Sequence, residues 1–411
     1  MLFAAACARG GAQTAPAPAP APAATPPPAV HDWQGEDLAI ATRFAPVFHQ
    51  ALAGDGRYDF ITNFDFDGDW IGDNNWDHAE DHRYPLKAYV YYVVSETQSH
   101  YFIHYAVFHP RDWKGGATTG RALSRTTRET VTLHEMIRPR GIIDDLVLSH
   151  ENDFEGALVV VDKTADALPG KVALVETVAH NKFLRFEPSA DPESENFLRM
   201  DGDRPVLWIE PKGHGVRSQP KSESGARRLF GKLKAVRRVQ DVIPGVPDSK
   251  EDPEPGDPTR VYQFTGTADD PILITVGPVG YELVPLYDTL WKHSQEGRNG
   301  TYGEVHDYGE LTVSAASGST KRTIKAKIGS IGSAFRGLAG AANKARPPWG
   351  WFDRSERDRP LGEWFFDPAN VLMRRLHDVK NWSTTYLHEP MLGILREATT
   401  GDRKPRAGTP D

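Results

Sequence analysis

The chain has 411 residues, with 48 lysines and arginines against 56 aspartates and glutamates, which gives a formal net charge of −8. This acidic balance argues against a general nucleic-acid binder, because such proteins are usually basic. No apolar run approaches the roughly 20 residues that span a bilayer, which argues against an integral membrane protein. The single cysteine excludes an internal disulfide framework and a multi-thiolate zinc site.

The first 30 residues predict a targeting segment followed by a tether. The stretch Ala4-Ala5-Ala6-Cys7 resembles the end of a bacterial lipoprotein signal, in which the cysteine is lipidated, although the charged start of such a signal is missing. The alternative is a random alanine-rich start. From Ala15 to Val30 the chain is mostly Ala and Pro, with seven prolines, which favours an extended, stiff spacer. We expect a protein anchored by lipid in the bacterial cell envelope, or a secreted one.

The body (31–395) is expected to form one large domain, followed by a disordered tail (396–411). Apolar residues at helical spacing predict a short helix over 38–52, which Pro46 would kink or split. The aromatic and β-branched runs between Leu86 and Pro110 predict a hairpin around Ser95–Ser99.

Further short strands are predicted to follow. LVLS before His150 and ALVVVDK after Glu155 read as a second hairpin, and KVALVETVAH, PVLWIE, RVYQFTG and PILITV continue the series. Short strands separated by turns predict a mainly β fold, an antiparallel, jelly-roll-like sandwich with a few peripheral helices.

Two basic stretches, about 225–240 and 328–342, have apolar residues near helical spacing and are predicted to be inserted helices. Basic amphipathic helices can lie in an anionic lipid interface. The alternative is that both helices pack on the sandwich with their basic faces in water.

Oxygen-bearing side chains alternate in the loop around Asp65, Asp67 and Asp69, and Gly68 allows a sharp turn. This pattern begins like an EF-hand loop, but Asn74 stands where the bidentate Glu belongs. The loop is therefore either a second, weaker cation site or a plain turn with solvated acids.

The segment His150-Glu151-Asn152-Asp153-Phe154-Glu155 carries the sharpest chemistry. Asp153 and Glu155 are two residues apart and share one face of a strand, and a turn could bring the imidazole of His150 to the same point. One imidazole and two carboxylates suit a hard divalent cation, Ca²⁺ or Mg²⁺ before Mn²⁺, with Asp144 or Asp145 as a further ligand. The alternative is an exposed polar turn between strands.

The same six residues resemble the His-Glu-Gly-Asp-Trp-Glu motif of a family related to vacuolar-sorting proteins and the Gly-His-Arg-His-Asp-Trp-Glu heptad of the necrosis- and ethylene-inducing protein family. The resemblance covers roughly 86–215. It implies a β-sandwich on which His150, Asp153 and Glu155 hold a divalent cation that helps to bind a sphingolipid headgroup, with membrane damage as the consequence. Phe154 and Asn152 depart from the motif, and the family's disulfide is impossible with one cysteine.

His214, between two glycines in Lys212-Gly213-His214-Gly215, is the first candidate for a distant ligand or a general base, and Glu151 is the second candidate base. His180 is a weaker candidate on the same grounds, while His104 and His109 are expected to be structural. The aromatic runs 347–353 and 362–368 are expected to pack in the core.

Three functions remain open. The first is a surface-tethered or secreted cation-binding protein that recognises a polar lipid or glycan headgroup at a membrane surface. The second is a metal-dependent hydrolase of a phosphate ester or glycoside. The chain carries no Gly-x-Ser-x-Gly, His-Glu-x-x-His or Walker signature. We therefore favour a protein that is not an enzyme, and we expect no nucleotide partner. The third is a structural envelope lipoprotein. A monomer is expected.

Overall fold

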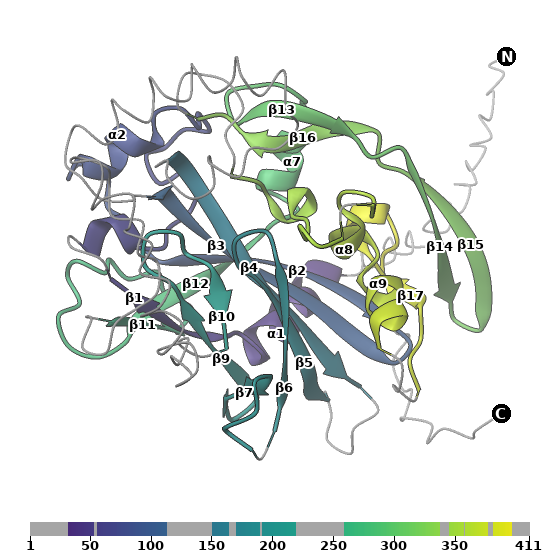
Figure 1. Cartoon of the computed structure of the whole chain (residues 1–411). Coiled ribbons are helices and arrows are strands. Elements are labelled where there is room, and N and C mark those ends of the chain that lie inside the picture. The colour runs from purple at the N-terminus through teal and green to yellow at the C-terminus, as the bar shows by residue number, and fades with distance from the viewer. Residues whose placement is uncertain are drawn as a thin grey trace, which may run out of the picture. The chain divides into compact units, whose positions relative to one another are not determined.

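Strands dominate the part of the chain that the computed structural model describes, namely residues 32–52, 56–112, 150–163, 170–189, 191–218, 259–337, 345–356, 358–376 and 381–396. These residues all belong to one unit, Asp32–Glu397 (Figure 1). The strands of its first half are β1 (Val47–Ala51), β2 (Tyr89–Thr97), β3 (His100–Asp112), β4 (His150–Asp162), β5 (Lys171–Val178), β6 (Phe183–Pro188), β7 (Phe197–Leu198), β8 (Met200–Asp201), β9 (Arg204–Ile209) and β10 (Val216–Arg217).

The later strands are β11 (Thr259–Phe264), β12 (Val279–Pro285), β13 (Tyr302–Asp307), β14 (Glu310–Ser317), β15 (Thr320–Lys327), β16 (Ser330–Phe335) and β17 (Thr385–His388). The helical elements are short: α1 (Trp33–Arg43), η1 (Gly56–Asp59), α2 (Asn75–Glu80), α7 (Leu290–Ser294), η3 (Pro348–Gly350), α8 (Glu363–Phe366), α9 (Pro368–Arg375) and η4 (Pro390–Leu392). None of the helices described is long and apolar enough to cross a bilayer.

One mixed sheet organises the fold, in the order β10-β9-β1-β11-β12-β2-β3-β4-β5-β6-β7, and β13 pairs with β16 in a second, two-stranded sheet. The fold is mainly β, as predicted, but the prediction of an antiparallel sandwich is only partly right. β1 runs parallel to β9, and β12 runs parallel to both β11 and β2. Alternation of apolar residues predicts that a strand has a buried face, and it carries no information about the direction of the neighbouring strand.

The long central strands are buried on both faces. On β3, Ile103 and Val107 belong to one core, while Phe102 and Phe108 belong to the other. The first core also contains Phe48 of β1, which lies far from β3 in the sheet order, so the sheet curls around it. Burial on both faces explains why these strands read as nearly continuous apolar runs.

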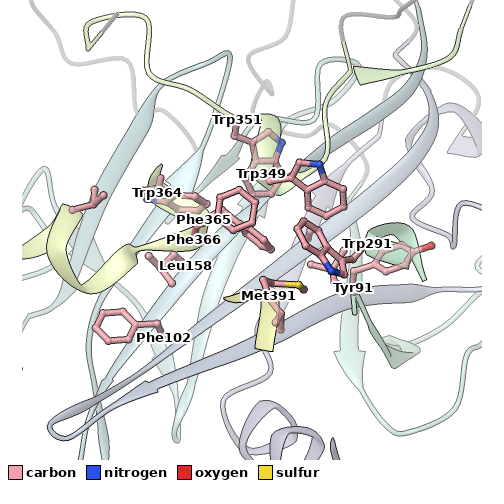
Figure 2. Packing of buried hydrophobic residues seen from close by; sticks show 14 of the residues in the cluster. Tyr91, Phe102, Leu158, Trp291, Trp349, Trp351, Trp364, Phe365, Phe366 and Met391 are labelled. Carbon is pink, nitrogen blue, oxygen red and sulfur yellow. The ribbon is translucent and has the colours of Figure 1, made fainter. Parts of the chain in front are cut away.

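The aromatic segments near the C-terminus close the second core, as predicted. Trp349, Trp351, Trp364, Phe365 and Phe366 are buried beside β3 and β4 (Figure 2). The rings meet at angles typical of aromatic packing; Trp291 and Trp349, for example, stand edge to face with centroids 5.2 Å apart. These rings hold the segment 345–356 against the sheet, where it contributes to the site described below.

Local structure confirms some sequence predictions and corrects others. The hairpin predicted between residues 86 and 110 is present as β2 and β3. The helix predicted over 38–52 is split, with α1 ending at Arg43 and β1 beginning at Val47, because Pro46 lies between them.

PILITV was predicted to be a strand, and that prediction was wrong: it forms an exposed turn between β11 and β12, in which Leu273 is 75% and Val276 89% exposed. Asp270 holds this turn, because its carboxylate accepts a hydrogen bond from the backbone N–H of Ile272 (2.8 Å) and its carbonyl accepts one from Leu273 (3.0 Å).

The prediction of a helix over 328–342 was also wrong for its described part, since residues 330–335 form β16. Pairing with β13 buries Ile331 and Phe335, so tertiary contacts override the helical spacing. The stretch 225–240, the tether before residue 31 and all of the predicted tail except Arg396 lie outside the described residues.

Candidate functional site

The motif found in the sequence lies at the start of β4. Its residues pair with the end of β3, with His150 opposite Asp112 and Asp153 opposite His109. The sequence predicted that the motif lies at a bend between two strands, and that prediction was wrong. The motif is part of one continuous strand. β5 pairs with β4 only from Ala157 onward, so the motif lies beyond the end of β5.

Asn152 sets the path of this strand. Its φ of 58° is left-handed, a conformation that asparagine tolerates better than most residues. The side-chain amide donates to the carbonyls of Gly72 and Arg336, both at 2.7 Å, and its oxygen accepts from Asn75 (2.6 Å). One buried side chain thus ties the motif strand to two distant loops and to α2.

We expect Asn152→Ala to lower the free energy of unfolding by about 3 kcal/mol, because it leaves buried partners unpaired and puts alanine in a left-handed conformation. Asn152→Gly removes the same hydrogen bonds without the backbone strain, and should cost about 1 kcal/mol less. Urea denaturation of both variants measures the difference. Equal losses in the two variants would contradict a strained backbone here.

A polar pocket of about 60 Å³ lies beside the motif. His150, Asp153 and Glu155, predicted as a ligand set, all contribute to its lining. The remaining lining residues come from β3, β4 and β5, from the turn after β5, from the turn before β10 and from the segment after β16: Asp112, Phe154, Val178, His180, Asn181, Gly213, Ala345, Arg346, Trp351 and Arg354.

His150 is oriented by the protein at both ring nitrogens. Its Nδ1 lies 2.8 Å from the carbonyl oxygen of Glu151, which fixes Nδ1 as the donor. Its Nε2 lies 3.3 Å from Oδ2 of Asp112. An imidazole nitrogen and a carboxylate at this distance can share a proton or a cation. Asp112 was not among the ligands predicted from the sequence.

Asp153 shares its carboxylate with a buried histidine. Nδ1 of His214 lies 2.8 Å from Oδ2 of Asp153, and Nε2 of His214 lies 3.2 Å from Oδ1 of Asp59. Burial lowers the pKa of His214, but the hydrogen bonds and charges of the two carboxylates outweigh it and raise the pKa to about 9. His214 is therefore a cation at neutral pH and holds both protons, which leaves it no lone pair for a metal or a proton.

The ring of His109 lies flat on that of His214, with centroids 3.6 Å apart and an angle of 3° between the planes. Burial, and then the charge of His214, hold the pKa of His109 well below its usual range. Its Nε2 donates to Oε1 of Gln50 (3.0 Å). His109 is thus a neutral structural ring, as predicted, and it packs against the charged one.

Backbone strain concentrates around this site. Six described non-glycine residues have a positive φ. Five of them lie at or next to the pocket, namely Asn152, His180, Asn181, Lys212 and His214. Left-handed backbone at such residues costs free energy and persists where surrounding contacts enforce it, which is common at binding sites.

The turn 211–215 supplies some of these contacts. The backbone N–H of Lys212 donates to Asp59 (2.8 Å). Gly215 leaves room for a neighbouring pair, because a Cβ there would lie 2.8 Å from the carboxylate of Glu210 and 3.2 Å from Nε2 of His180. Glycine at 215 therefore allows Glu210 and His180 to lie close to the backbone of this turn.

The carboxylate of Glu210 orients the ring of His180 at the pocket wall. The side chain of His180 is 27% exposed, and its Nε2 is hydrogen-bonded to Oε2 of Glu210, which is buried. Arg217 pairs with the other oxygen of Glu210. Burial raises the pKa of Glu210, but the contacts with His180 and Arg217 outweigh it and bring the pKa to about 2.

Other predicted site residues lie elsewhere. Glu151 is fully buried opposite Arg111 and does not line the pocket. Asp144, Asp145 and Cys7 lie outside the described residues.

The acidic loop after β1 forms a turn. Within the described ranges, Asp67, Asp69 and His78 are the one group of three possible ligands whose atoms all lie within 4.8 Å of one another. Asp65 instead accepts from the amide of Asn63 (2.8 Å). Nδ1 of His78 lies 2.5 Å from Oδ2 of Asp67, so hydrogen bonds already satisfy this group.

No protein-family model matches the chain, and no curated protein is similar to it. Several solved structures are. NLPPya in complex with glucosamine is 17% identical over 44% of this chain and 67% of that one, with a TM-score of 0.26.

Necrosis and Ethylene inducing Protein 2 from the causal agent of cocoa's Witches Broom disease is 16% identical over 44% and 67% of the two chains, with a TM-score of 0.26. The non-toxic HaNLP3 protein is 15% identical over 47% and 72%, with a TM-score of 0.25. The geometry of the pocket, and not this likeness, supports the function proposed below.

Proposed function

We propose that the pocket binds a divalent cation and, through it, the hydroxyl groups of a polar lipid or glycan headgroup. The supporting observation is the donor set, in which His150, Asp112, Asp153 and Glu155 line one small pocket. One imidazole and three carboxylates suit a hard cation. A bound cation would offset the charge of the acids and leave positions open for oxygen atoms of a ligand.

The spacing of the donors favours a cation that keeps part of its water shell. Among the described residues, the ligand atoms of His150, Asp153 and Glu155 do not form a group within 4.8 Å of one another. Magnesium commonly binds proteins through one or two carboxylates and retains several waters. A pocket of about 60 Å³ has room for several water molecules. We therefore expect Mg²⁺ to bind before Ca²⁺ or Mn²⁺.

Isothermal titration of the full chain with MgCl₂ tests this proposal. Asp112→Asn and Glu155→Gln should each weaken Mg²⁺ binding by about tenfold or more, because each removes a negative charge from the donor set. Glu310→Gln, at a half-exposed carboxylate on β14 that does not line the pocket, is the matched control and should leave Mg²⁺ binding unchanged. Parent protein that takes up no divalent cation would refute the proposal.

The headgroup is tested separately. We expect the parent protein, and not His150→Ala, to bind vesicles that carry a glycosylated lipid, with binding abolished by a chelator. Leakage of vesicle contents would add membrane damage to the function. The membrane surface and the lipid anchor at Cys7 remain proposals from the sequence alone.

One observation favours the alternative of a hydrolase. His180 stands at the pocket wall with its Nε2 held by the buried Glu210, and a carboxylate that orients an imidazole is a common arrangement for a general base. Turnover of a phosphate ester or glycoside that needs both Mg²⁺ and His180 would establish that activity.

A further inference from the structure

The hairpin of β14 and β15 is strongly basic, although the chain as a whole has a net charge of −8. β15 contains Lys321, Arg322, Lys325 and Lys327 and no acid. The one acid of the hairpin, Glu310, lies 3.6 Å from Lys325, and both side chains are at least half exposed. An exposed ion pair of this kind contributes little free energy. The hairpin therefore presents an excess of positive charge to the solvent.

β15 is also an edge of the main sheet and lies outermost in its hairpin (Figure 1). It pairs with β14 from Thr320 to Lys327, and among the described residues no strand lies along its other side. Proteins commonly protect such an edge with a proline, a bulge or a very short strand. β15 has no proline, its register with β14 is regular, and it is eight residues long. Charged side chains are therefore what protects this edge.

The register of the hairpin shows which backbone groups point to the open side. Ser317 and Thr320 flank a two-residue turn, and the first turn residue, Gly318, has the positive φ (59°) that such turns require. The flanking residues form a hydrogen-bonded pair, and these pairs alternate with non-hydrogen-bonded ones along an antiparallel ladder. The N–H and C=O groups that point away from β14 are thus those of Lys321, Thr323, Lys325 and Lys327.

Three of these four residues also carry the positive charges of the solvent face. Ala326 is buried in the aromatic core and Ile324 packs against it, so these side chains face inward. Because side chains alternate along a strand, Lys321, Lys325 and Lys327 lie on the opposite face, where all three are exposed. A strand added along β15 would therefore have one face beside the lysines and the other beside Ile324 and Ala326.

We propose that β15 binds an extended acidic segment of another protein, which adds to the sheet as a further strand. Hydrogen bonds to the outward backbone groups give affinity, and acids at alternate positions opposite the lysines give specificity. A second copy of β15 does not fit. An antiparallel pair centred on Lys325 sets this residue against itself, and one centred on Ile324 sets Lys321 against Lys327, so like charges repel.

An anionic bilayer fits this edge less well than a strand does. Segments that bind acidic lipids through charge usually gather roughly four to eight basic residues. The solvent face of β15 has its lysines in a single row, with Glu310 beside one of them. A bilayer also offers no row of backbone groups at the spacing of a strand. None of these residues lines the pocket beside the motif, so this surface is independent of the proposed cation site.

Titration of the full chain with a fluorescein-labelled peptide of about ten residues, in which glutamate alternates with valine and threonine, tests the charge complementarity. The peptide should bind saturably. The double variant Lys321→Glu with Lys325→Glu should weaken binding by about tenfold or more, because two attractive cross-strand pairs become repulsive. A peptide with lysine in place of glutamate should not bind. Lys292→Glu, at an exposed lysine on α7, is the matched control and should bind like the parent.

A further variant tests the addition of a strand. Thr323→Pro removes an N–H that points to the open side, so pairing with β14 is kept while the peptide loses a hydrogen bond and meets the proline ring. Binding should weaken by about tenfold, with an unchanged circular dichroism spectrum. In the parent protein, the peptide should slow hydrogen exchange at the amides of residues 321, 323 and 325. This measurement decides the question if the proline variant does not fold.

Three results would overturn the inference. If charge reversal abolishes binding but the peptide leaves amide exchange on β15 unchanged, the peptide is held by charge alone. If the double variant binds the acidic peptide like the parent, the site lies elsewhere. If vesicles that contain phosphatidylserine bind through the lysines and the peptide does not bind, the hairpin meets a lipid surface and not a strand.

Discussion

Replacing His214 by alanine should lower the free energy of unfolding by about 3–5 kcal/mol, the usual cost of removing one partner from a buried group of charges. His214 is fully buried between Asp59 and Asp153, at 3.2 and 2.8 Å. Its pKa of about 9 means that it carries the positive charge that compensates these two acids at neutral pH. Without it, two buried carboxylates face each other's charge with no cation between them.

Urea denaturation followed by tryptophan fluorescence measures the loss. His306→Ala is the control, because His306 is exposed on β13 and its removal should change stability by less than about 0.5 kcal/mol. In the double variant His214→Ala with Asp59→Asn, part of the stability should return, since one of the uncompensated charges is gone. If His214→Ala has the same free energy of unfolding as the parent, the ion group formed by Asp59, Asp153 and His214 does not hold the turn 211–215 to the sheet.

The same ion group shows what the sequence could and could not reveal about the site. His150, Asp153 and Glu155 were found together because six adjacent residues on one strand carry the pattern. Asp59 lies 94 residues before Asp153 and has no motif of its own. His214 lies 61 residues after Asp153, and its flanking glycines indicated a distant ligand or base but not an ion pair with Asp59 and Asp153. Such contacts depend on which strands become neighbours, and local spacing does not encode that.

The sequence contains more information about Asp112 than about Asp59. It ends the aromatic run YFIHYAVFHPRD, and antiparallel pairing of β3 with β4 places it opposite His150. Recognising the motif as part of a strand would have given this register. The sequence was instead interpreted as a bend at the motif, because polar residues usually mark turns, and here the left-handed Asn152 lets a strand carry them.

The fold shows the same division between local and distant information. β2 and β3 were predicted because their apolar runs are long and separated by a polar patch. The parallel pairing of β1 with β9, which sets Val47 against Val206, joins segments too far apart for any local pattern to specify their direction. This pairing, with β11 and β12, turns the expected sandwich into a curled mixed sheet.

Glu389 should contribute a fall in the stability of the protein as the pH rises from about 5 to about 9, and Glu389→Gln should remove that contribution. Glu389 is buried beside η4, and its Oε2 has no hydrogen-bond partner among the described residues. Burial raises its pKa to about 8, with the charges of Asp367 and Asp37 acting in the same direction against hydrogen bonds from Ser95 and Met391. The carboxyl is therefore protonated in the folded protein at neutral pH.

The sign of the effect follows from proton counting. Below pH 4.5, the usual value for Glu, the carboxyl is protonated in both states and contributes no pH dependence. Between this value and about 8 the folded state keeps the proton that the unfolded state loses, so each rise in pH favours unfolding, and above about 8 the full cost remains. A shift of this size corresponds to a few kcal/mol.

Denaturation of parent and Glu389→Gln at pH 5, 7 and 9 tests the prediction. The glutamine side chain has the same shape and cannot ionise, so the two proteins should be similar at pH 5, and the variant should be the more stable by a few kcal/mol at pH 9. Glu310→Gln, at a half-exposed carboxylate on β14, is the control and should follow the parent. Parallel pH profiles for parent and Glu389→Gln would mean that the carboxyl at 389 ionises in the folded protein as easily as in water.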